Sequence, residues 1–507
     1  MKEVPLYDSP SYTRNGQDWT GSFWGVVDQC DESLHWDASS ILSILSFNYP
    51  VGDRTLVKEV SRSPWLSSFD KNGLVCEQPI PTHGTARVRP GVFASKMLHL
   101  LTEEAVAACQ DKDEIYVLLS GGLDSRIVAG VLQRAHAAGA IKVKPIALSW
   151  GLKGSRDVHY AKKVAEILGF EFQHIQMSPE DLYHNIVDGS KEIGCLVPPN
   201  HLHCMSWLKN LSKNSLVLAG SYGDSIGRAE FSGRHLLELD YLKPINTFGL
   251  LKSDLLDVAS SGIGQDFQRL KQRAGNVEKY VHCEHQAQGF YMRSMIAHVM
   301  NVINGYSNLY QMFTAPSVYQ YVWSIHPACR DNRMYAHLLE LLHPTLARIP
   351  WARTNKALKG KTQWANKSLK KDFHMYKEWI EGSLYDDIVK LNDPDWFEAT
   401  GIFDVESVKK LSHAIKGGHP GYAQYGKRSY ELWLWLASFR IFAQEFEKRS
   451  KIVILDVNLG KCSSGNRSIE FDRRSGFRRK MSTIKPLHSI VSKMRKFYVK
   501  RRALRRF

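Results

Sequence analysis

The chain has 507 residues, enough for two or three domains with sizeable cores, and its composition (43% hydrophobic, 23% charged) is ordinary for a soluble globular protein. The net charge of +16 is concentrated in residues 471–507, where 14 Lys and Arg stand against one Asp, so the rest of the chain carries only +3. The polar opening, residues 1–15, argues against a signal peptide, and eight cysteines without paired spacing argue against a disulfide framework. We therefore expect a cytoplasmic protein.

The first strongly predicted element is a strand that runs into a helix. Residues 115–119, IYVLL, are β-branched and apolar, as in a strand buried on both faces. Apolar residues then recur at helical spacing: Ile127, Val128, Val131 and Leu132. Between them lies SGGLDS, 120–125, whose small residues let several backbone N–H groups point at one anion, most often phosphate. The alternative is an ordinary tight turn in which Ser and Asp cap the helix.

The chemistry of SGGLDS suits a magnesium-bound phosphate. Ser125 offers a hydroxyl donor, and the carboxylate of Asp124 can hold a magnesium ion that bridges phosphate oxygens. The lysine of a GxxxxGK[ST] loop is missing. SGGLDS instead resembles the pyrophosphate loop (PP-loop) of the N-type ATP pyrophosphatases, which transfer AMP to a substrate and release pyrophosphate. The resemblance implies ATP binding through all six residues: Ser120, Gly121, Gly122, Leu123, Asp124 and Ser125.

A strand, a helix and a second strand are predicted over residues 147–181. The apolar face of the helix is formed by four residues: Ala161, Val164, Ala165 and Leu168. Gly169 ends the helix. The run "ALSWGLKGSRDVHYAKKVAEILGFEFQHIQMSPED" resembles asparagine synthetases. This resemblance implies an α/β fold with a doubly wound parallel sheet, in which Leu148 and Ser149 lie near the adenine and Asp157 near the nucleotide.

A second glycine-rich loop follows the predicted strand 216–218. "AGSYGDSIG" resembles the family's SGEGADELFGG loop, so Gly220 matches its first glycine and Asp224 its magnesium-binding acid. Ser221 stands where the family has a Glu that contacts substrate or acts as a base. Serine cannot take a proton at neutral pH, which argues against the ordinary aspartate-to-asparagine reaction while leaving ATP binding intact. Tyr222 is the alternative proton acceptor.

The segment "HPTLARIPWARTNKALKGK", 343–361, resembles the part of the family that carries an Arg-x-Lys. There the lysine stabilises the acyl transition state and the leaving pyrophosphate, which needs fixed positive charge. The resemblance assigns these catalytic roles to Arg353 and Lys356, with Lys359 and Lys361 as rivals. The alternative is a solvated basic loop.

The first 90 residues resemble only part of a glutaminase domain. "YPVGDRTLVKEVSRSPWLSSFDKNG", 49–73, is similar to the end of such a domain in asparagine synthetases. The family exposes an N-terminal cysteine nucleophile, whereas residue 2 here is Lys and the first cysteine is Cys30. We expect 1–90 to be a small, degenerate α+β remnant that does not hydrolyse glutamine, or an unrelated α+β segment. Residues 91–450 then form the synthetase-like domain with a helical second half, and 451–507 a basic tail.

Three further features lie outside these motifs. The tail spaces its apolar residues like a basic amphipathic helix, which predicts contact with the inner face of an anionic membrane or with another polyanion, against a plain solvated tail; no specific nucleic acid is predicted. "LWLWLASF", 432–439, is too short to span a bilayer and is predicted as a buried helix. "HLHC", 201–204, with Cys195 lacks the spacing of a zinc site and is assigned to the core.

Together these features predict an AMP-forming, ATP- and Mg²⁺-dependent amide ligase. A small-molecule carboxylate becomes an acyl-adenylate, and ammonia or an amine from a separate source displaces AMP. The alternatives are an intramolecular cyclase resembling β-lactam synthetase or the lasso-peptide cyclases, an adenylating RNA-modifying enzyme, and a nucleotide-binding scaffold without activity.

Overall fold

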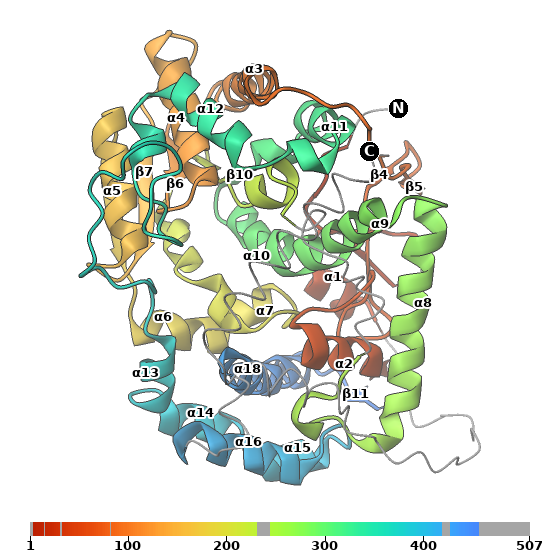
Figure 1. Cartoon of the computed structure of the whole chain (residues 1–507). Coiled ribbons are helices and arrows are strands. Elements are labelled where there is room, and N and C mark those ends of the chain that lie inside the picture. The colour runs from red at the N-terminus through yellow and green to blue at the C-terminus, as the bar shows by residue number, and fades with distance from the viewer. Residues whose placement is uncertain are drawn as a thin grey trace, which may run out of the picture. The chain divides into compact units, whose positions relative to one another are not determined.

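In the computed structural model, five parallel strands form one sheet in the order β10-β9-β6-β7-β8. Strands β6, β7 and β10 are labelled in Figure 1. Their bounds are β6 Ile115–Leu118, β7 Ile146–Gly151, β8 Glu171–Gln176, β9 Leu216–Leu218 and β10 Asn308–Tyr310. The chain proceeds outward from β6 to β8 on one side, then returns to β9 and β10 on the other. The strand order therefore reverses between β6 and β9, which makes a topological switch point. The predicted α/β fold with a doubly wound parallel sheet is confirmed.

The structure describes residues 4–14, 16–30, 33–81, 83–230, 244–417 and 426–455. All of them belong to one compact unit, Met1–Asp456. The predicted contacts of the basic tail fall outside the described residues.

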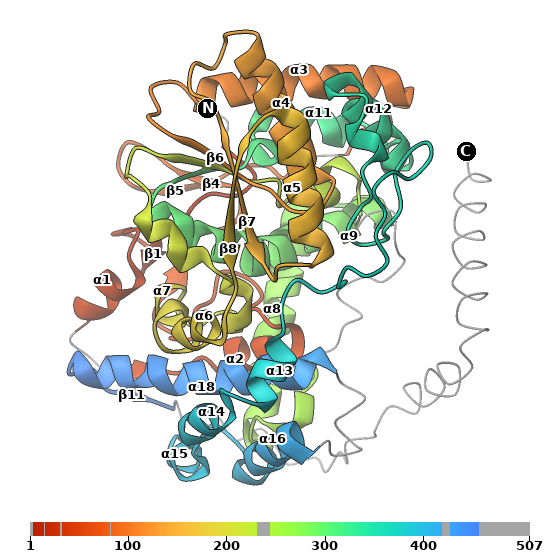
Figure 2. The same ribbon diagram turned by 90° about the vertical axis from the view of Figure 1, so that its left-hand side faces the viewer.

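Two predicted helices cover the first strands of the sheet. Helix α4 (Asp124–Ala137) buries the four apolar residues that defined its predicted face. Helix α5 (Arg156–Leu168) is capped at its N-terminus by Ser155, whose hydroxyl accepts a hydrogen bond from the Val158 N–H at 3.4 Å. Gly169, with φ of +69°, caps its C-terminus. Figure 2 shows α4 and α5 lying along β6, β7 and β8. Apolar spacing thus defines α4, and local caps define the ends of α5.

The N-terminal residues form short strands and helices joined to later parts of the chain. Their elements are β1 Tyr12–Thr13, α1 Phe23–Asp28, β2 Leu34–His35, α2 Ala38–Phe47, β3 Ser61–Arg62, β4 Ser67–Phe69 and β5 Val75–Glu77. Strands β1 and β3 pair antiparallel, as do β4 and β5, while β2 pairs in parallel with β11 (Val453–Ile454). Helix α2 packs on α8 (Leu256–Ala274), beside it in Figure 1. The glutaminase-like origin of 1–90 and its boundaries stay predictions.

Helices dominate the remainder of the described chain. Their bounds are α3 Pro90–Ala108, α6 Pro179–His184, α7 Ser190–Glu192, α9 Lys279–Gln286, α10 His298–Met300, α11 Pro316–Ser324, α12 Asn332–Leu342, α13 Tyr376–Glu381, α14 Tyr385–Leu391, α15 Pro394–Ala399, α16 Val405–Gly417 and α18 Lys427–Lys448. A π-helical stretch, Ala287–Ala297, joins α9 to α10. Residues 432–439 lie buried within α18, which confirms the predicted buried helix. Among the described residues, no helix combines the length and apolar character needed to cross a membrane.

Candidate active site

A cavity of about 280 Å³ opens at the switch point, where β6, β7 and β9 end. Ligands of open parallel sheets bind at this position. The structure brings ten of the predicted binding residues to the lining of this switch-point cavity: Ser120, Gly122, Asp124, Ser125, Leu148, Ser149, Asp157, Gly220, Ser221 and Asp224. They come from three separate stretches of sequence, which lie within or after strands β6, β7 and β9 of the sheet.

Hydrogen bonds within SGGLDS hold the loop in a tight curve. The Ser120 N–H donates to the Ser125 hydroxyl at 3.1 Å, and the Gly122 N–H donates to the Ser120 hydroxyl at 3.1 Å. The two hydroxyls lie 3.1 Å apart. Helix α4 begins within this loop, at Asp124, and its first two residues line the same cavity, so its N-terminus lies beside it.

The two glycines of this loop serve different purposes. A Cβ on Gly121 would lie 2.6 Å from the Cβ of Ala352 and 3.0 Å from the Cα of Asp157. The Ala352 N–H also donates to the Gly121 carbonyl at 3.0 Å. Gly121 therefore makes room for another segment of the protein, whereas Gly122 lines the cavity.

The second loop touches the first backbone to backbone. A Cβ on Gly220 would lie 2.6 Å from the Ser125 nitrogen and 2.7 Å from the carbonyl carbon of Asp124. A Cβ on Gly223 would lie 2.4 Å from Asp124 Oδ1. Because both positions lack side chains, the loop comes close enough to place Asp224 in the same cavity as Asp124.

We expect Gly220→Ala to separate the two loops. Overpacking against rigid backbone costs about 1–3 kcal/mol, and the same cost in bringing the loops together around ATP should lower the affinity about fivefold to a hundredfold. Isothermal titration calorimetry with Mg²⁺ and ATP measures this loss. Gly264→Ala is the matched control, because a Cβ there meets nothing within 4 Å and alanine is favoured inside helix α8. Equal affinities in the two variants would contradict the prediction.

Asp124 is a buried acid with unmet bonding capacity. Its Oδ1 has no hydrogen-bond partner within the described ranges, and its Oδ2 lies 3.5 Å from an Arg228 nitrogen. Burial raises the pKa of Asp124 to about 7, Arg228 opposes that rise, and the nearby Asp224 adds to it. Two carboxylates that disfavour each other's charge fit a hard divalent cation, which prefers oxygen ligands.

The donor set fits magnesium better than a metal held by protein alone. The described part of the chain contains no group of three or more His, Cys, Asp or Glu placed to hold a metal. Mg²⁺ is usually bound by one or two carboxylates together with the phosphates of a substrate. Asp124 and Asp224 are the residues that would hold it.

Arg228 is a further charged residue that we did not predict. Its side chain is only 5% exposed and lies between Asp124 and Glu230, 3.6 Å from the latter. Its guanidinium lies 5.2 Å from the ring centre of Tyr335 and 5.3 Å from that of Trp351. These rings come from distant parts of the sequence, so no local pattern could have revealed a buried positive charge here.

The predicted catalytic residues lie in three different settings. Arg353 forms an ion pair with Glu230 at 3.3 Å and is 55% exposed. It therefore contacts Glu230, the partner of Arg228, from the solvent side. Lys356 is exposed and is not among the described residues that line the cavity. Its rival Lys359 pairs with Glu340 at 2.7 Å.

Two other predicted residues lie behind the cavity surface. Tyr222 is 2% exposed and its ring packs 4.8 Å from that of Tyr7. Burial raises the pKa of Tyr222, which makes it a poor proton acceptor at neutral pH. Leu123 is buried as well, with 1% exposure. The structure brings neither side chain to the cavity lining formed by the described residues.

The remaining wall of the cavity is apolar and was not predicted. Trp150, Met300 and Phe373 line it together with Leu148. Phe373 is held in place by its carbonyl, which accepts the Leu152 N–H at 2.8 Å. The cavity thus has an apolar wall beside an end that carries carboxylates and backbone amide groups. This arrangement suits a ligand with a base at one end and phosphates at the other.

Comparison with known proteins agrees with this geometry. Residues 97–191 match the family model described as asparagine synthase, a stretch that includes β6, SGGLDS, β7, α5 and β8 but ends before the second loop. Among solved structures, the chain is similar to NMN synthetase from Francisella tularensis, with 15% identity and a TM-score of 0.22 over 40% of this chain and 94% of that chain. No curated protein matches the chain. Over residues 97–191, the chain is similar to the asparagine synthase family.

Proposed function

We propose that the chain is an ATP-dependent, AMP-forming ligase that joins a carboxylate to an amine as an amide. The observation that carries this proposal is the meeting of two acid-bearing loops at the switch point, with Asp124 Oδ1 buried and without a hydrogen-bond partner among the described residues. The asparagine synthase match supports the use of ATP.

The residues of this site have two roles: some bind the nucleotide, and others compensate the negative charge of its phosphates. SGGLDS and the N-terminus of α4 bind the phosphates, and the apolar wall receives the base. Mg²⁺ on Asp124 and Asp224 would neutralise phosphate charge. Arg228, which lies beside Asp124, supplies fixed positive charge near the phosphates, which lowers the energy of the negative charge that develops on the leaving pyrophosphate. Arg353 is held by Glu230 at the edge of this site.

Product analysis tests the proposed function. Purified protein is incubated with ATP, Mg²⁺ and a pool of metabolite carboxylates and amines, and the nucleotide products are separated. We expect AMP and pyrophosphate in equal amounts, together with an amidated compound found by mass spectrometry. ADP and phosphate as products, or no turnover of ATP at all, would contradict the proposal. Pyrophosphate release that requires added RNA would favour the RNA-modifying alternative.

A further inference from the structure

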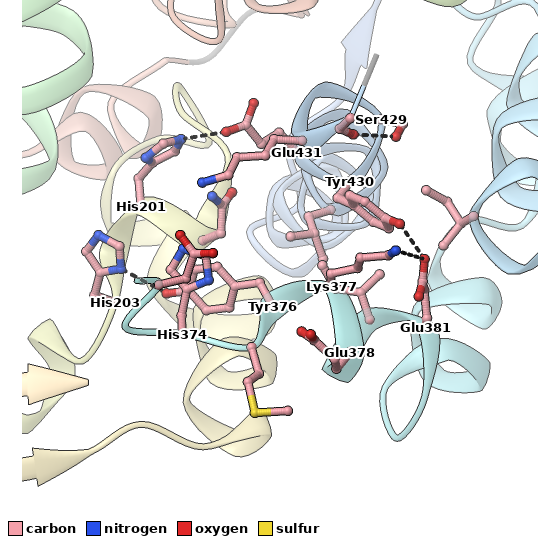
Figure 3. A pocket seen from close by; sticks show the side chains of 18 of the residues that line it. His201, His203, His374, Tyr376, Lys377, Glu378, Glu381, Ser429, Tyr430 and Glu431 are labelled. Atoms are coloured by element: carbon pink, nitrogen blue, oxygen red, sulfur yellow. Dashed lines mark hydrogen bonds and ion pairs between the residues drawn. The ribbon is translucent and has the colours of Figure 1, made fainter. Parts of the chain in front are cut away.

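A second, larger cavity of about 770 Å³ adjoins the switch-point cavity (Figure 3). The two share a wall: Phe373 lines the switch-point cavity, while its neighbours Asp372 and His374 line the second cavity. His203 also lines the second cavity, and its ring lies 6.3 Å from that of Trp150, which lines the first. A ligand in the second cavity would therefore lie next to a nucleotide in the first.

One half-buried carboxylate faces the second cavity. Glu431, in the second turn of α18, has a side chain that is 17% exposed. Its Oε2 accepts a hydrogen bond from Asn48 at 2.8 Å, and its Oε1 lies 3.5 Å from His201 Nε2, the contact marked between them in Figure 3. Burial raises the pKa of Glu431, but His201, Asn48 and Arg428 together lower it below its usual value, so the group carries a negative charge.

The polar atoms around this carboxylate are incompletely bonded. His201 Nε2 is buried and has no hydrogen-bond partner in the described chain, since 3.5 Å to Glu431 is long for such a bond. Asn200, which also lines the cavity, is 9% exposed, and its Oδ1 has no partner among the same residues. Buried polar groups are normally hydrogen-bonded, so unmet hydrogen-bonding capacity on residues that line one cavity points to a ligand in it.

The other charges of this cavity are exposed at its rim or paired. The four lysines that line it are all exposed: Lys370, Lys371, Lys377 and Lys427. Glu381 is engaged by Tyr430 and lies 3.9 Å from Lys377. Water screens exposed charges, so the charge that selects a ligand is the half-buried one, Glu431. Behind it the cavity is apolar, with Ile380 and Leu434 buried.

We propose that the second cavity binds an organic amine through Glu431 and Asn200. An ammonium group offers three N–H donors, which match the oxygens of a carboxylate and of an amide. The apolar surface receives the carbon skeleton. The volume is typical of sites for small organic molecules and far larger than ammonia requires. That this amine is the nitrogen donor of the ligase rests on the proposed function; the binding itself does not.

Binding of benzylamine and of phenylacetate, two probes of similar shape and opposite charge, tests the proposal. Saturation-transfer NMR on the full chain without ATP measures both. We expect benzylamine to bind and phenylacetate to bind at least about tenfold more weakly. Glu431→Gln should weaken benzylamine binding about tenfold or more, whereas the control Glu378→Gln, which removes an exposed rim carboxylate of the same cavity, should leave it unchanged.

Several results would overturn the amine site. They are tighter binding of phenylacetate than of benzylamine, equal effects of the two glutamine variants, and unchanged benzylamine binding in Glu431→Gln. If circular dichroism shows that Glu431→Gln does not fold, Asn200→Ala takes its place with the same expected loss. Benzylamine binding without any release of pyrophosphate from ATP would keep the amine site and refute the ligase; pyrophosphate release without benzylamine binding would do the reverse.

Discussion

The Asp124→Asn protein is expected to lose magnesium-dependent ATP binding. Asparagine keeps the shape of the side chain but removes the charge that a magnesium ion needs beside Asp224. Interactions of charged groups contribute about 1.5–3 kcal/mol each, so the affinity for ATP in the presence of Mg²⁺ should fall about tenfold to a hundredfold. Calorimetric titrations with ATP in Mg²⁺ and in EDTA measure the effect. The variant should bind ATP equally weakly in both buffers.

Asp254→Asn is the control for this experiment. Asp254 is exposed and is not one of the described residues lining the switch-point cavity, so ATP binding and its dependence on Mg²⁺ should be unchanged. Wild-type affinity in the Asp124→Asn protein, or a loss that is the same with and without Mg²⁺, would show that Asp124 does not hold the metal.

Glu284→Ala is expected to destabilise the fold by about 3–5 kcal/mol, because it leaves the buried Arg330 without its counter-charge. Both side chains are fully buried, and two hydrogen bonds of 2.9 and 2.7 Å join them. His83 Nε2 lies 2.7 Å from the same carboxylate, and Arg330 also donates to the Ile226 carbonyl at 3.0 Å. Ile226 belongs to the loop that carries Asp224, so the network also supports the site. Urea denaturation measures the loss.

The pH dependence of stability gives an independent check of the same pair. Burial alone would raise the pKa of Glu284, but Arg330 and His83 outweigh burial and lower the pKa to about 2. A folded-state pKa below the unfolded value means that the stabilisation is complete above about pH 4.5 and is lost as the pH falls toward 2. The Glu284→Ala protein should lack this part of the acid dependence. Asp387→Asn, which breaks an exposed pair with Lys390, should leave the urea midpoint unchanged. Equal losses in both variants would contradict the prediction.

Four of the five strands and the two loops were predictable because their signals are local, whereas β10 (Asn308–Tyr310) was not predicted. β6 is a continuous apolar run, α5 has a serine cap and a terminal glycine, and each glycine-rich loop directly follows a strand. Arg228 and Phe373 were not predictable, because each depends on neighbours from distant stretches of the chain. The same limit applies to Gly121, whose neighbour Ala352 lies far along the sequence.

Two residues predicted to be catalytic, Tyr222 and Lys356, do not line the cavity, for a related reason. Motif spacing cannot tell which side chains of a loop face a cavity and which face the core. Tyr222 turns toward Tyr7, although its neighbour Ser221 lines the cavity. Lys356 lies on an exposed part of its loop, although Ala352 of the same loop contacts Gly121.

The pairing of β2 with β11 sets a constraint on folding during synthesis. The N–H groups of Leu34 and Trp36 donate to the carbonyls of Ile452 and Ile454, each at 3.0 Å. The ribosome adds those two acceptors more than four hundred residues after the donors. The N-terminal segment must therefore wait for nearly the whole chain before its backbone is satisfied, and closing so long a loop is slow. A nascent chain stalled before Lys451 would keep an unpaired strand edge. Such an edge can pair with other chains and aggregate unless a chaperone binds it.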